Sequence, residues 1–305
     1  MQNAQNSNGA ARPPVFPGLT IIDKLGEGGM STVWLAVDRR SGVKVAIKVL
    51  RPEFTKSRED IQQFIEESRV METIDHEGIV KSYGVDAFDG KIFYLMEYID
   101  GYSFGSLLER KQHVGEADCL LICESVASAL DYAWNNFGIV HCDIQPDNIM
   151  INSEGVVKLT DLGLSQTFSF LQEGQKDVSE HVMGTPAYIS PEQIYGDVEL
   201  DCRADIYSLG ASLYHLASGR TLFPKLSSEE TLRAQCDDNC QAPDPSTFHP
   251  LSEGFCQLLE AMLVKNRDYR IRTWSDVFEM CREIESGAVF KPRTTEHPSS
   301  IKLLQ

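Results

Sequence analysis

The sequence predicts an α+β fold made of a small, mainly β N-terminal lobe and a larger, mainly α C-terminal lobe. Segments of alternating apolar and polar residues dominate up to about residue 99, and apolar residues at helical spacing dominate beyond it. Asp100-Gly101 interrupts both patterns and predicts a hinge between the lobes. We therefore expect a flexible leader at 1–17, a domain at 18–287 divided into lobes 18–99 and 100–287, and an irregular tail at 288–305.

Five strands are predicted in the first lobe because β-branched and aromatic residues alternate there with polar ones. They span Leu19–Gly26, Thr32–Asp38, Lys44–Leu50, Ile79–Asp86 and Ile92–Tyr98. Between the third and fourth strands, apolar residues at helical spacing predict an amphipathic helix at about Glu59–Ile74.

Helices dominate the second lobe. The longest, Ala117–Phe137, carries an apolar stripe that includes Cys119 and Cys123, and three more helices are expected at Asp205–Ser218, Gly254–Leu263 and Thr273–Glu285. Two short β segments, Ile149–Ile151 and Val156–Leu159, flank a turn at Asn152–Gly155.

Composition excludes several classes of protein. The 305 residues suffice for one large domain or two packed lobes, and 42% hydrophobic with 24% charged residues is ordinary for a soluble chain. A net charge of -17 makes nucleic acid a poor partner. No apolar run reaches the roughly 18 residues of a membrane span, and the polar N-terminus lacks a signal-peptide core, so we expect a cytoplasmic location.

Eight cysteines form neither a disulfide framework nor a zinc motif. Cys236 and Cys240 are four residues apart, but no second Cys or His pair lies at zinc-like spacing. We expect free thiols in a reducing compartment.

A glycine-rich loop, Leu25-Gly26-Glu27-Gly28-Gly29-Met30-Ser31-Thr32-Val33, joins the first two predicted strands. A dinucleotide-binding fold would need a helix directly after such a loop, whereas this chain continues into a strand. A hairpin that closes over phosphates fits better, and a plain glycine-rich hairpin is the alternative.

Lys48 ends the run Val45-Ala46-Ile47-Lys48 on the third strand. Strand alternation sends its side chain to the same face as Ala46, where a lysine is costly unless it is paired. Glu67 on the predicted helix can supply that partner, while a solvated strand-end lysine is the alternative interpretation.

The stretch His141-Cys142-Asp143-Ile144-Gln145-Pro146-Asp147-Asn148 is followed after twelve residues by Asp161-Leu162-Gly163. It places Asp143 and Asn148 five residues apart, with Asp161 just beyond a β-rich segment. A phosphoryl-transfer site needs one carboxylate for the attacking hydroxyl and oxygen ligands such as an Asn and an Asp for magnesium.

These motifs, in this order and followed by a Pro-Glu pair, resemble the eukaryotic-type (Hanks-type) protein kinase family over about residues 19–285. The resemblance implies the bilobal protein kinase fold. Three further motifs look like the bacterial Ser/Thr branch: Gly184-Thr185-Pro186, Ser190-Pro191-Glu192 and Asp205-Ile206-Tyr207-Ser208-Leu209-Gly210. The His-Cys-Asp and Asp-Leu-Gly sequences are unusual for the family.

The resemblance implies ATP and Mg²⁺ as cofactors and assigns roles residue by residue. Lys48 would hold the α- and β-phosphates and pair with Glu67, and Asp143 would accept or orient the proton of the substrate hydroxyl. Asn148 and Asp161 would hold the metal. The glycine-rich loop would cover the phosphates with residues Gly26, Glu27, Gly28, Gly29, Met30, Ser31 and Thr32.

The same resemblance implies an adenine pocket. Its walls would be Leu25, Val33, Ala46 and Met150, with Met96 at the gatekeeper position and the backbone of Glu97 and Ile99 bonding the adenine edge.

The resemblance also implies four supporting roles. Thr185 would lie beside the catalytic Asp143, and Glu192 would form a buried pair with Arg270. His141 would pack as a structural residue rather than act as a base, and Leu162 would stack on Met71 and His141.

Two departures from the family pattern bear on activity. Gln145 stands where Ser/Thr kinases usually place a lysine that contacts the γ-phosphate, and Cys142 replaces the arginine that grips a phosphorylated activation loop. The resulting hypothesis is a slow kinase whose activity depends little on phosphorylation of loop residues Ser165, Thr167, Ser169 and Ser179. Neutral drift in an ordinary kinase is the alternative.

The leading interpretation is an ATP-dependent protein serine/threonine kinase, a phosphotransferase acting on Ser/Thr hydroxyls of protein substrates. The rival is a pseudokinase that acts as a nucleotide-gated protein-binding module, suggested by the joint departures at Gln145, Cys142, Leu162 and Ser31. A tyrosine kinase fits Thr185-Pro186 less well, and a small-molecule kinase usually lacks the Gly-Thr-Pro…Pro-Glu segment. The sequence identifies neither the protein substrate, the upstream signal, the oligomeric state nor the role of the tail.

Overall fold

The computed structural model describes residues 14–28, 31–51, 65, 69–162, 185–197 and 199–287. They fall into two compact units, of which the first holds the described residues of Met1–Ile65 and Ser82–Tyr98. The second holds those of Glu66–Lys81 and Ile99–Gln305. The division after Tyr98 lies next to the predicted lobe boundary, but the segment before residue 82 belongs to the second unit instead of the first. Most of the predicted leader and the whole predicted tail lie outside the described residues.

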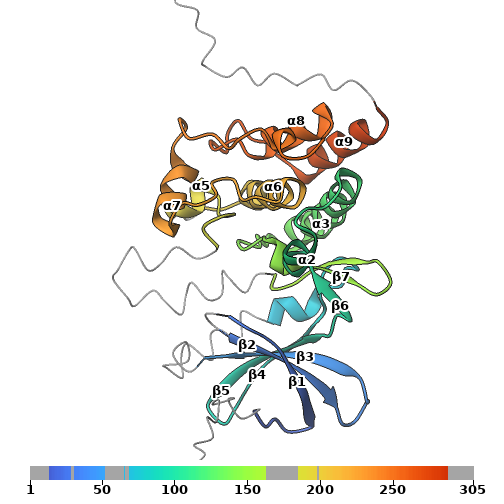
Figure 1. Cartoon of the computed structure of the whole chain (residues 1–305). Helices are drawn as coiled ribbons and strands as arrows, with labels where there is room; N and C mark the ends of the chain where they lie inside the picture. The colour runs from blue at the N-terminus through green and yellow to red at the C-terminus, as the bar shows by residue number, and fades with distance from the viewer. Residues whose placement is uncertain are drawn as a thin grey trace, which may run out of the picture. The chain divides into compact units, whose positions relative to one another are not determined.

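The first unit is an antiparallel sheet whose strands run in the order β1-β2-β3-β5-β4 (Figure 1). The bounds are β1 Leu19–Glu27, β2 Ser31–Asp38, β3 Lys44–Leu50, β4 Ser82–Phe88 and β5 Lys91–Glu97. All five predicted strands are present, and β1 and β2 form the expected hairpin around the glycine-rich loop. The fourth begins later than predicted, because Ile79 forms an isolated parallel bridge with Leu159 of the second unit.

The core of the first unit lies on one face of this sheet. Val45, Ile47 and Val49 of β3 pack there with Phe16, Leu19, Trp34, Ala36 and Phe93. Since strand side chains alternate, Ala46 and Lys48 project from the opposite face, as the sequence predicts. In the ladder, Ala46 pairs with Met96, and Lys48 lies between Val33 and Tyr94.

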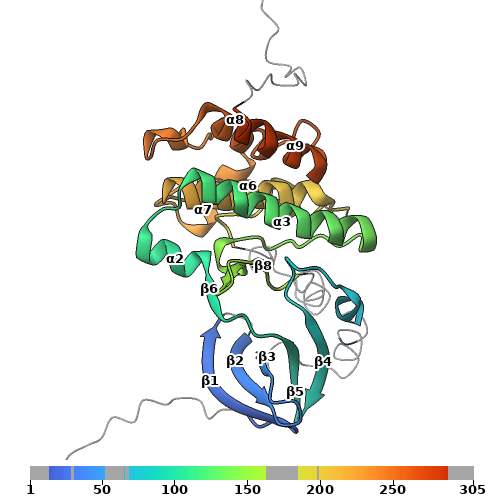
Figure 2. The ribbon, with the colours of Figure 1, turned by 90° about the vertical axis from the view of Figure 1, so that its right-hand side faces the viewer.

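The second unit is built mainly of helices (Figure 2). The bounds are α2 Phe104–Lys111, α3 Glu116–Phe137, α5 Pro191–Tyr195, α6 Cys202–Ser218, α7 Ser228–Cys236, α8 Glu253–Met262 and α9 Trp274–Glu285, with 3-10 turns η2 Arg69–Thr73, η3 Pro146–Asn148 and η4 Pro245–Thr247. Helix α3 packs against both α6 and α9, and α8 packs against α6 and α9. The four helices predicted for this part of the chain are confirmed.

Two glycines allow this packing. A Cβ on Gly210 of α6 would lie 2.8 Å from the Cβ of Met262, so only glycine lets α8 approach so closely. Gly138 ends α3 in the left-handed conformation, with φ 66°, and its N–H caps the carbonyls of Ala133 and Trp134. This cap turns the chain into the segment that carries His141 and Asp143.

A small second sheet, in the order β6-β7-β8, completes the helical unit. Its strands are β6 Gly101–Ser103, β7 Ile149–Asn152 and β8 Val157–Leu159. The β7–β8 hairpin matches the two short predicted segments. Strand β6 occupies the position where the sequence predicts only a hinge.

The predicted helix at Glu59–Ile74 lies largely outside the described residues, and its final part, Arg69–Thr73, is a 3-10 turn instead of an α-helix. All eight cysteines are free thiols, and Cys119 and Cys123 are both fully buried as expected. Within the described ranges, no helix is long and apolar enough to span a membrane.

Candidate active site

The buried carboxyl group of Asp205 holds the backbone of the loop that carries Asp143. Asp205 lies in the first turn of α6 and is 2% exposed. Its Oδ2 accepts the backbone N–H of His141 at 2.7 Å, and its Oδ1 accepts that of Cys142 at 2.9 Å. The loop reverses at Cys142, whose φ of 67° is left-handed and uncommon for a residue with a Cβ. Two hydrogen bonds to one buried carboxyl group therefore hold a sharply turned backbone.

His141 links this loop to the segment before Asp161. The imidazole is fully buried, its Nδ1 accepts the N–H of Asp143 at 3.2 Å, and its Nε2 lies 2.8 Å from the carbonyl oxygen of Thr160. Because Nδ1 accepts, Nε2 is the nitrogen that donates to Thr160 in this network. The geometry gives His141 a structural role, as the sequence predicts, and commits both ring nitrogens to backbone groups.

The Asp143 carboxylate accepts hydrogen bonds from two side-chain amides, those of Asn148 and Gln145. Asn148 Nδ2 donates to Oδ2 at 3.0 Å and also to the Asp143 carbonyl oxygen at 2.8 Å. Gln145 Nε2 donates to Oδ1 at 3.0 Å and to Oδ2 at 3.1 Å. Both donors are neutral, so they orient the carboxylate without adding a positive charge beside it.

Gln145 also connects Asp143 to Thr185, which lies forty residues further along the chain. The Thr185 hydroxyl donates to Gln145 Oε1 at 2.8 Å. The amide of Gln145 thus accepts from one side and donates to the other, which an ammonium group could not do because it has no acceptor. Thr185 is brought to the Asp143 network as predicted, with Gln145 as the bridge.

Asn148 and Asp161 are the predicted magnesium ligands, and the β7–β8 hairpin brings their backbones together. Ile149 pairs with Leu159, and the carbonyl oxygen of Asn148 accepts the N–H of Thr160 at 2.9 Å. Asn148 donates both of its hydrogen bonds to Asp143 through Nδ2, and its Oδ1 is the type of atom that magnesium prefers as a ligand.

The described residues contain no group of three His, Cys, Asp or Glu side chains that could hold a metal by themselves. An Asn and an Asp suit a magnesium ion whose remaining ligands come from phosphates and water. The donor set therefore fits the predicted metal.

A buried ion pair ties the segment after Thr185 to the helical unit. Arg270 donates to both oxygens of Glu192, at 2.6 and 3.0 Å, with the side chains 0% and 5% exposed. This is the pair that the sequence predicts. The next residue, Gln193, donates through Nε2 to the carbonyl oxygen of Cys142 at 2.8 Å. Helix α5, which carries Glu192 and Gln193, is therefore also bonded to the loop that carries Asp143.

The predicted nucleotide-binding residues belong to both units. The first unit holds Leu25, Gly26, Glu27, Ser31, Thr32, Val33, Ala46, Lys48, Met96 and Glu97 on its strands and Gly28 directly after β1, and the second unit holds Ile99 and Met150. Gly29, Met30 and Glu67 lie outside the described residues, so the predicted Lys48–Glu67 pair stays a prediction. Leu162 and Met71 are both buried in the hydrophobic core of the second unit, and the stacking of Leu162 on Met71 and His141 stays a prediction.

The sequence interpretation assigned no role to Asp205, Gln193 or Thr160. Asp205 sits one helical turn after the N-cap residue Asp201, so a carboxylate at a helix start was the available signal. The bridging function of Gln145 depends on Thr185, and no local pattern connects residues so far apart.

Asp205 should make folding stability depend on pH. Burial raises the pKa of its carboxyl to about 7, nearby Glu192 adds to the rise, and the N–H groups of His141 and Cys142 oppose it. In the unfolded chain the group titrates near 3.8, so between these values the native state holds a proton that the unfolded state has released. Stability should therefore fall as pH rises from about 4 to about 7 and level off above.

The measurement is the free energy of unfolding by urea at several pH values, for the parent and for Asp205→Asn. Other carboxyl groups affect the pH dependence of both proteins equally. The difference in the free energy of unfolding between the parent and Asp205→Asn therefore isolates the effect of Asp205. We expect this difference to change by at least about 1 kcal/mol across the window. A difference that stays constant with pH would contradict the assignment.

Comparison with known proteins identifies the class. The family model for the protein kinase domain matches residues 19–281, which is most of the chain. The protein belongs to the protein kinase family, and the α+β architecture of a β-sheet unit and a helical unit is that of its kinase domains.

The curated proteins to which the chain is similar include bacterial serine/threonine-protein kinases. It is 38% identical over 209 residues to a serine/threonine-protein kinase PknA of Corynebacterium glutamicum, covering 67% of this chain and 44% of that protein. PknA of Mycobacterium tuberculosis is 33% identical over 276 residues, covering 89% and 62%. The chain thus spans about two fifths to three fifths of the length of these curated relatives.

Solved structures of kinase domains have the same fold. A crystal structure of the Mycobacterium tuberculosis PknI kinase domain matches with a TM-score of 0.70 at 25% identity, covering 88% of this chain and 96% of that one. A second structure of the same domain gives 0.71 at 24% identity, covering 90% and 98%, and bears on the fold alone.

Proposed function

We propose that this chain is an ATP-dependent protein kinase that transfers the γ-phosphate to serine or threonine hydroxyls. The observation that carries the proposal is the Asp143 carboxylate, held by Asn148 and Gln145 and bridged to Thr185. A pseudokinase has no need to keep a carboxylate oriented in this way. The presence of Lys48, Asn148 and Asp161 in the same chain supports catalysis as well.

In this proposal each residue acts through a simple interaction. Asp143 orients the acceptor hydroxyl and takes its proton as the new P–O bond forms, while the bond between the γ-phosphorus and the bridging oxygen breaks and ADP leaves. Lys48, paired with Glu67, holds the α- and β-phosphates, and Asn148 and Asp161 hold magnesium. The bound metal supplies neutralisation of charge on the phosphate oxygens. The adenine lies against Leu25, Val33, Ala46, Met96 and Met150, with Glu97 and Ile99 bonding its edge through the backbone.

The direct test uses radiolabelled ATP, magnesium and a generic basic protein substrate, followed by phosphoamino acid analysis. We expect label on serine and threonine, both in the substrate and by autophosphorylation, and loss of labelling when EDTA removes the metal. ATP binding without any transfer would support the pseudokinase alternative, and label on tyrosine would overturn the specificity.

Gln145 should make the transfer slow. The transition state spreads negative charge over the γ-phosphoryl oxygens, and a lysine at this position would offer a positive charge that a neutral amide lacks. Gln145→Lys keeps a donor for Asp143 and adds that charge, at the cost of the acceptor for Thr185. We expect kcat to rise about tenfold, a fraction of the 10²–10³ typical for a whole electrostatic contact.

The measurement is steady-state kcat with saturating Mg-ATP. Gln145→Met is the matched control, since it removes both the donor and the acceptor at similar size, and it should be slower than the parent. If Gln145→Lys were no faster than the parent, the missing charge would not be the reason for a slow reaction.

Cys142 should make activity insensitive to phosphorylation of the activation segment. Its side chain is buried with Val140 and Ala204 and carries no positive charge that could bind a phosphate. The candidate phosphorylation sites Ser165, Thr167, Ser169 and Ser179 lie outside the described residues. We expect phosphatase treatment to change kcat less than about twofold, with phosphate removal verified by mass spectrometry. A large fall in activity would contradict this expectation.

A further inference from the structure

Thr185, whose hydroxyl bonds Gln145, begins a tight turn of the backbone. The N–H of Tyr188 donates to the carbonyl oxygen of Thr185 at 2.9 Å, which closes a four-residue turn with Pro186 and Ala187 at its centre. Proline suits the second position of such a turn because its φ is fixed. The position of the Thr185 hydroxyl, and with it the 2.8 Å bond to Gln145 Oε1, therefore depends on where this turn is held.

A buried glutamine of helix α7 is bonded to the centre of the turn. Gln235 lies next to the last residue of α7 and is 0% exposed. Its Nε2 donates to the carbonyl oxygens of Pro186 and Ala187, each at 3.2 Å. These two carbonyls take no part in closing the turn, so Gln235 fixes it from outside through both N–H groups of one amide.

The orientation of the Gln235 amide is set by a third partner. Tyr207 of α6, which is 1% exposed, donates its hydroxyl to Gln235 Oε1. Burial raises the pKa of the Tyr207 hydroxyl, so the hydroxyl keeps the proton that it donates. Because the carbonyl oxygens of Pro186 and Ala187 can only accept, a flipped amide would place Oε1 against two other acceptors. One orientation therefore satisfies every polar atom of the Gln235 side chain.

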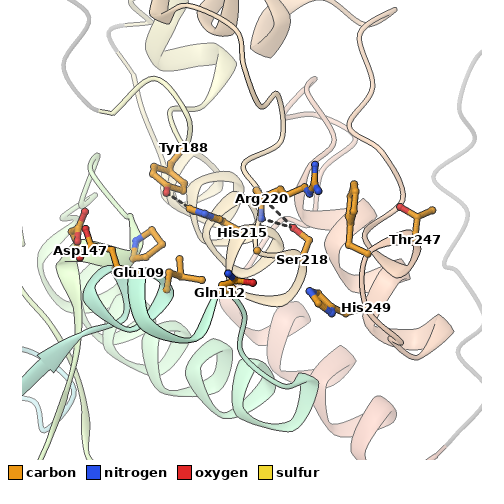
Figure 3. A pocket seen from close by; sticks show the side chains of 14 residues that line it. Glu109, Gln112, Asp147, Tyr188, His215, Ser218, Arg220, Thr247 and His249 are labelled. Atoms are coloured by element: carbon orange, nitrogen blue, oxygen red, sulfur yellow. Dashed lines mark hydrogen bonds between the residues drawn. The ribbon is translucent and has the colours of Figure 1, made fainter.

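The last residue of the turn has a separate contact. The Tyr188 hydroxyl lies 2.7 Å from Nδ1 of His215 on α6, where both residues line a cavity of about 830 Å³ (Figure 3). This contact is made by a side chain at the end of the turn, whereas Gln235 bonds the backbone at its centre. A change at Gln235 therefore removes the central bonds and leaves the partners of the Tyr188 contact in place.

We propose that Gln235 is a positioning residue for phosphoryl transfer. It holds the central carbonyls of the turn, so that the Thr185 hydroxyl reaches Gln145. The amide of Gln145 in turn orients the Asp143 carboxylate. The inference rests on the proposed kinase function, because Asp143 acts there on the acceptor hydroxyl. Gln235 contacts neither substrate nor nucleotide in this proposal and acts only through the turn.

The first measurement is kcat with saturating Mg-ATP for the parent, Gln235→Met and Tyr207→Phe, expressed per ATP-binding site so that unfolded protein does not count. Gln235→Met removes the donors to the turn at similar size. We expect its kcat to fall about tenfold, a part of the roughly hundredfold cost of misplacing a catalytic group by about 1 Å. Tyr207→Phe leaves these donors in place and should keep a kcat close to that of the parent. The affinity for ATP should be the same in all three proteins.

The free energy of unfolding in urea separates positioning from a purely structural role. Gln235→Met and Tyr207→Phe each leave a buried polar group without its partner, so both should be less stable than the parent. Only Gln235→Met should lose kcat. A fall in kcat of the same size in both variants would indicate a general effect of destabilisation and would overturn the proposal.

Gln235→Glu is a second variant for the case in which Gln235→Met does not fold. It keeps an acceptor for Tyr207 and loses the N–H donors to the turn, so its kcat should fall as well. A folded variant of either kind with the kcat of the parent would contradict the positioning role. Gln241→Met is the matched control, because Gln241 is exposed and donates to the carbonyl oxygen of Asp238, outside the turn. It should match the parent in kcat and in stability.

Combination with Thr185→Val tests the route by which Gln235 acts. Thr185→Val removes the hydroxyl that bonds Gln145 and should itself lower kcat. If Gln235 acts through this hydroxyl, adding Gln235→Met to Thr185→Val should lower kcat little further, because both changes break one network. A double variant whose loss equals the product of the two single losses would show that Gln235 acts by another route, and it would refute the proposal.

Failure of the kinase function is distinguishable from these outcomes, since it would appear as the absence of magnesium-dependent labelling by the parent. Hydrogen exchange then tests the contact between Gln235 and the turn without any need for activity. The backbone N–H of Tyr188 should exchange about fivefold faster in Gln235→Met than in the parent or in Tyr207→Phe, because the turn opens at a lower cost. Unchanged exchange in Gln235→Met would overturn the proposal, whether or not the parent transfers phosphate.

Discussion

Asp143→Asn is expected to lower kcat for phosphoryl transfer by about 10²–10⁴-fold, the range for loss of a positioned general base. In the parent, the two carboxylate oxygens accept from Asn148 and Gln145. An asparagine would turn an N–H₂ group toward one of these donors, so it loses the proton acceptor and also disturbs the pair of amides that orient it.

The measurement is kcat with saturating Mg-ATP, together with the affinity for ATP measured separately. Because Asp143 is proposed to act on the acceptor hydroxyl, ATP affinity should change little. Asp118→Asn, an exposed carboxylate in the first turn of α3, is the control for a lost negative charge. Phosphoryl transfer that survives at the parent rate in Asp143→Asn would refute the role of this carboxylate.

Arg270→Ala is expected to destabilise the fold by roughly 3–5 kcal/mol, because it leaves the Glu192 carboxylate buried and unpaired. The arginine also donates to the carbonyl oxygens of Val264, Lys265 and Arg203, and its guanidinium lies over the ring of Tyr207. Glu192→Ala should cost less than Arg270→Ala, since the guanidinium keeps these carbonyl and ring contacts when the carboxylate is removed.

The free energy of unfolding in urea tests both variants, with circular dichroism as the probe. Glu229→Ala is the control, because its pair with Arg233 is exposed and should be worth no more than about 1 kcal/mol. The double variant should cost less than the sum of the single ones, as expected for residues in direct contact. Additive costs, or a loss below about 1 kcal/mol in Arg270→Ala, would contradict the proposed role of the pair.

Strong local patterns were enough to predict most of the fold. The alternation in Lys44–Leu50 located β3 and the side of the sheet on which Lys48 lies. The long apolar stripe located α3 within one residue at its start. The short helices α2, α5 and α7 escaped prediction because they hold only a turn or two each and are stabilised by caps and neighbours.

In the candidate site, too, some residues could be predicted from local motifs and others could not. Asp143, Asn148 and Thr185 could be found from motifs, and they come together as expected. The sequence interpretation of Gln145 as a lysine replacement was incomplete, because its second bond depends on a residue forty positions away. The role of Asp205 depends on how α6 packs against the loop, and a carboxylate in the first turn of a helix does not by itself indicate which backbone groups it bonds.

The hydrogen bonds between Asp205 and the loop that carries Asp143 affect which substitutions position 142 tolerates. The carboxyl group of Asp205 accepts the backbone N–H groups of residues 141 and 142, and every amino acid except proline supplies such a group at position 142. These two bonds therefore do not depend on which side chain stands at position 142, whereas its left-handed φ and buried surroundings restrict which side chains fit there. A non-proline side chain that tolerates this φ and this space can replace Cys142 while both hydrogen bonds to Asp205 stay in place.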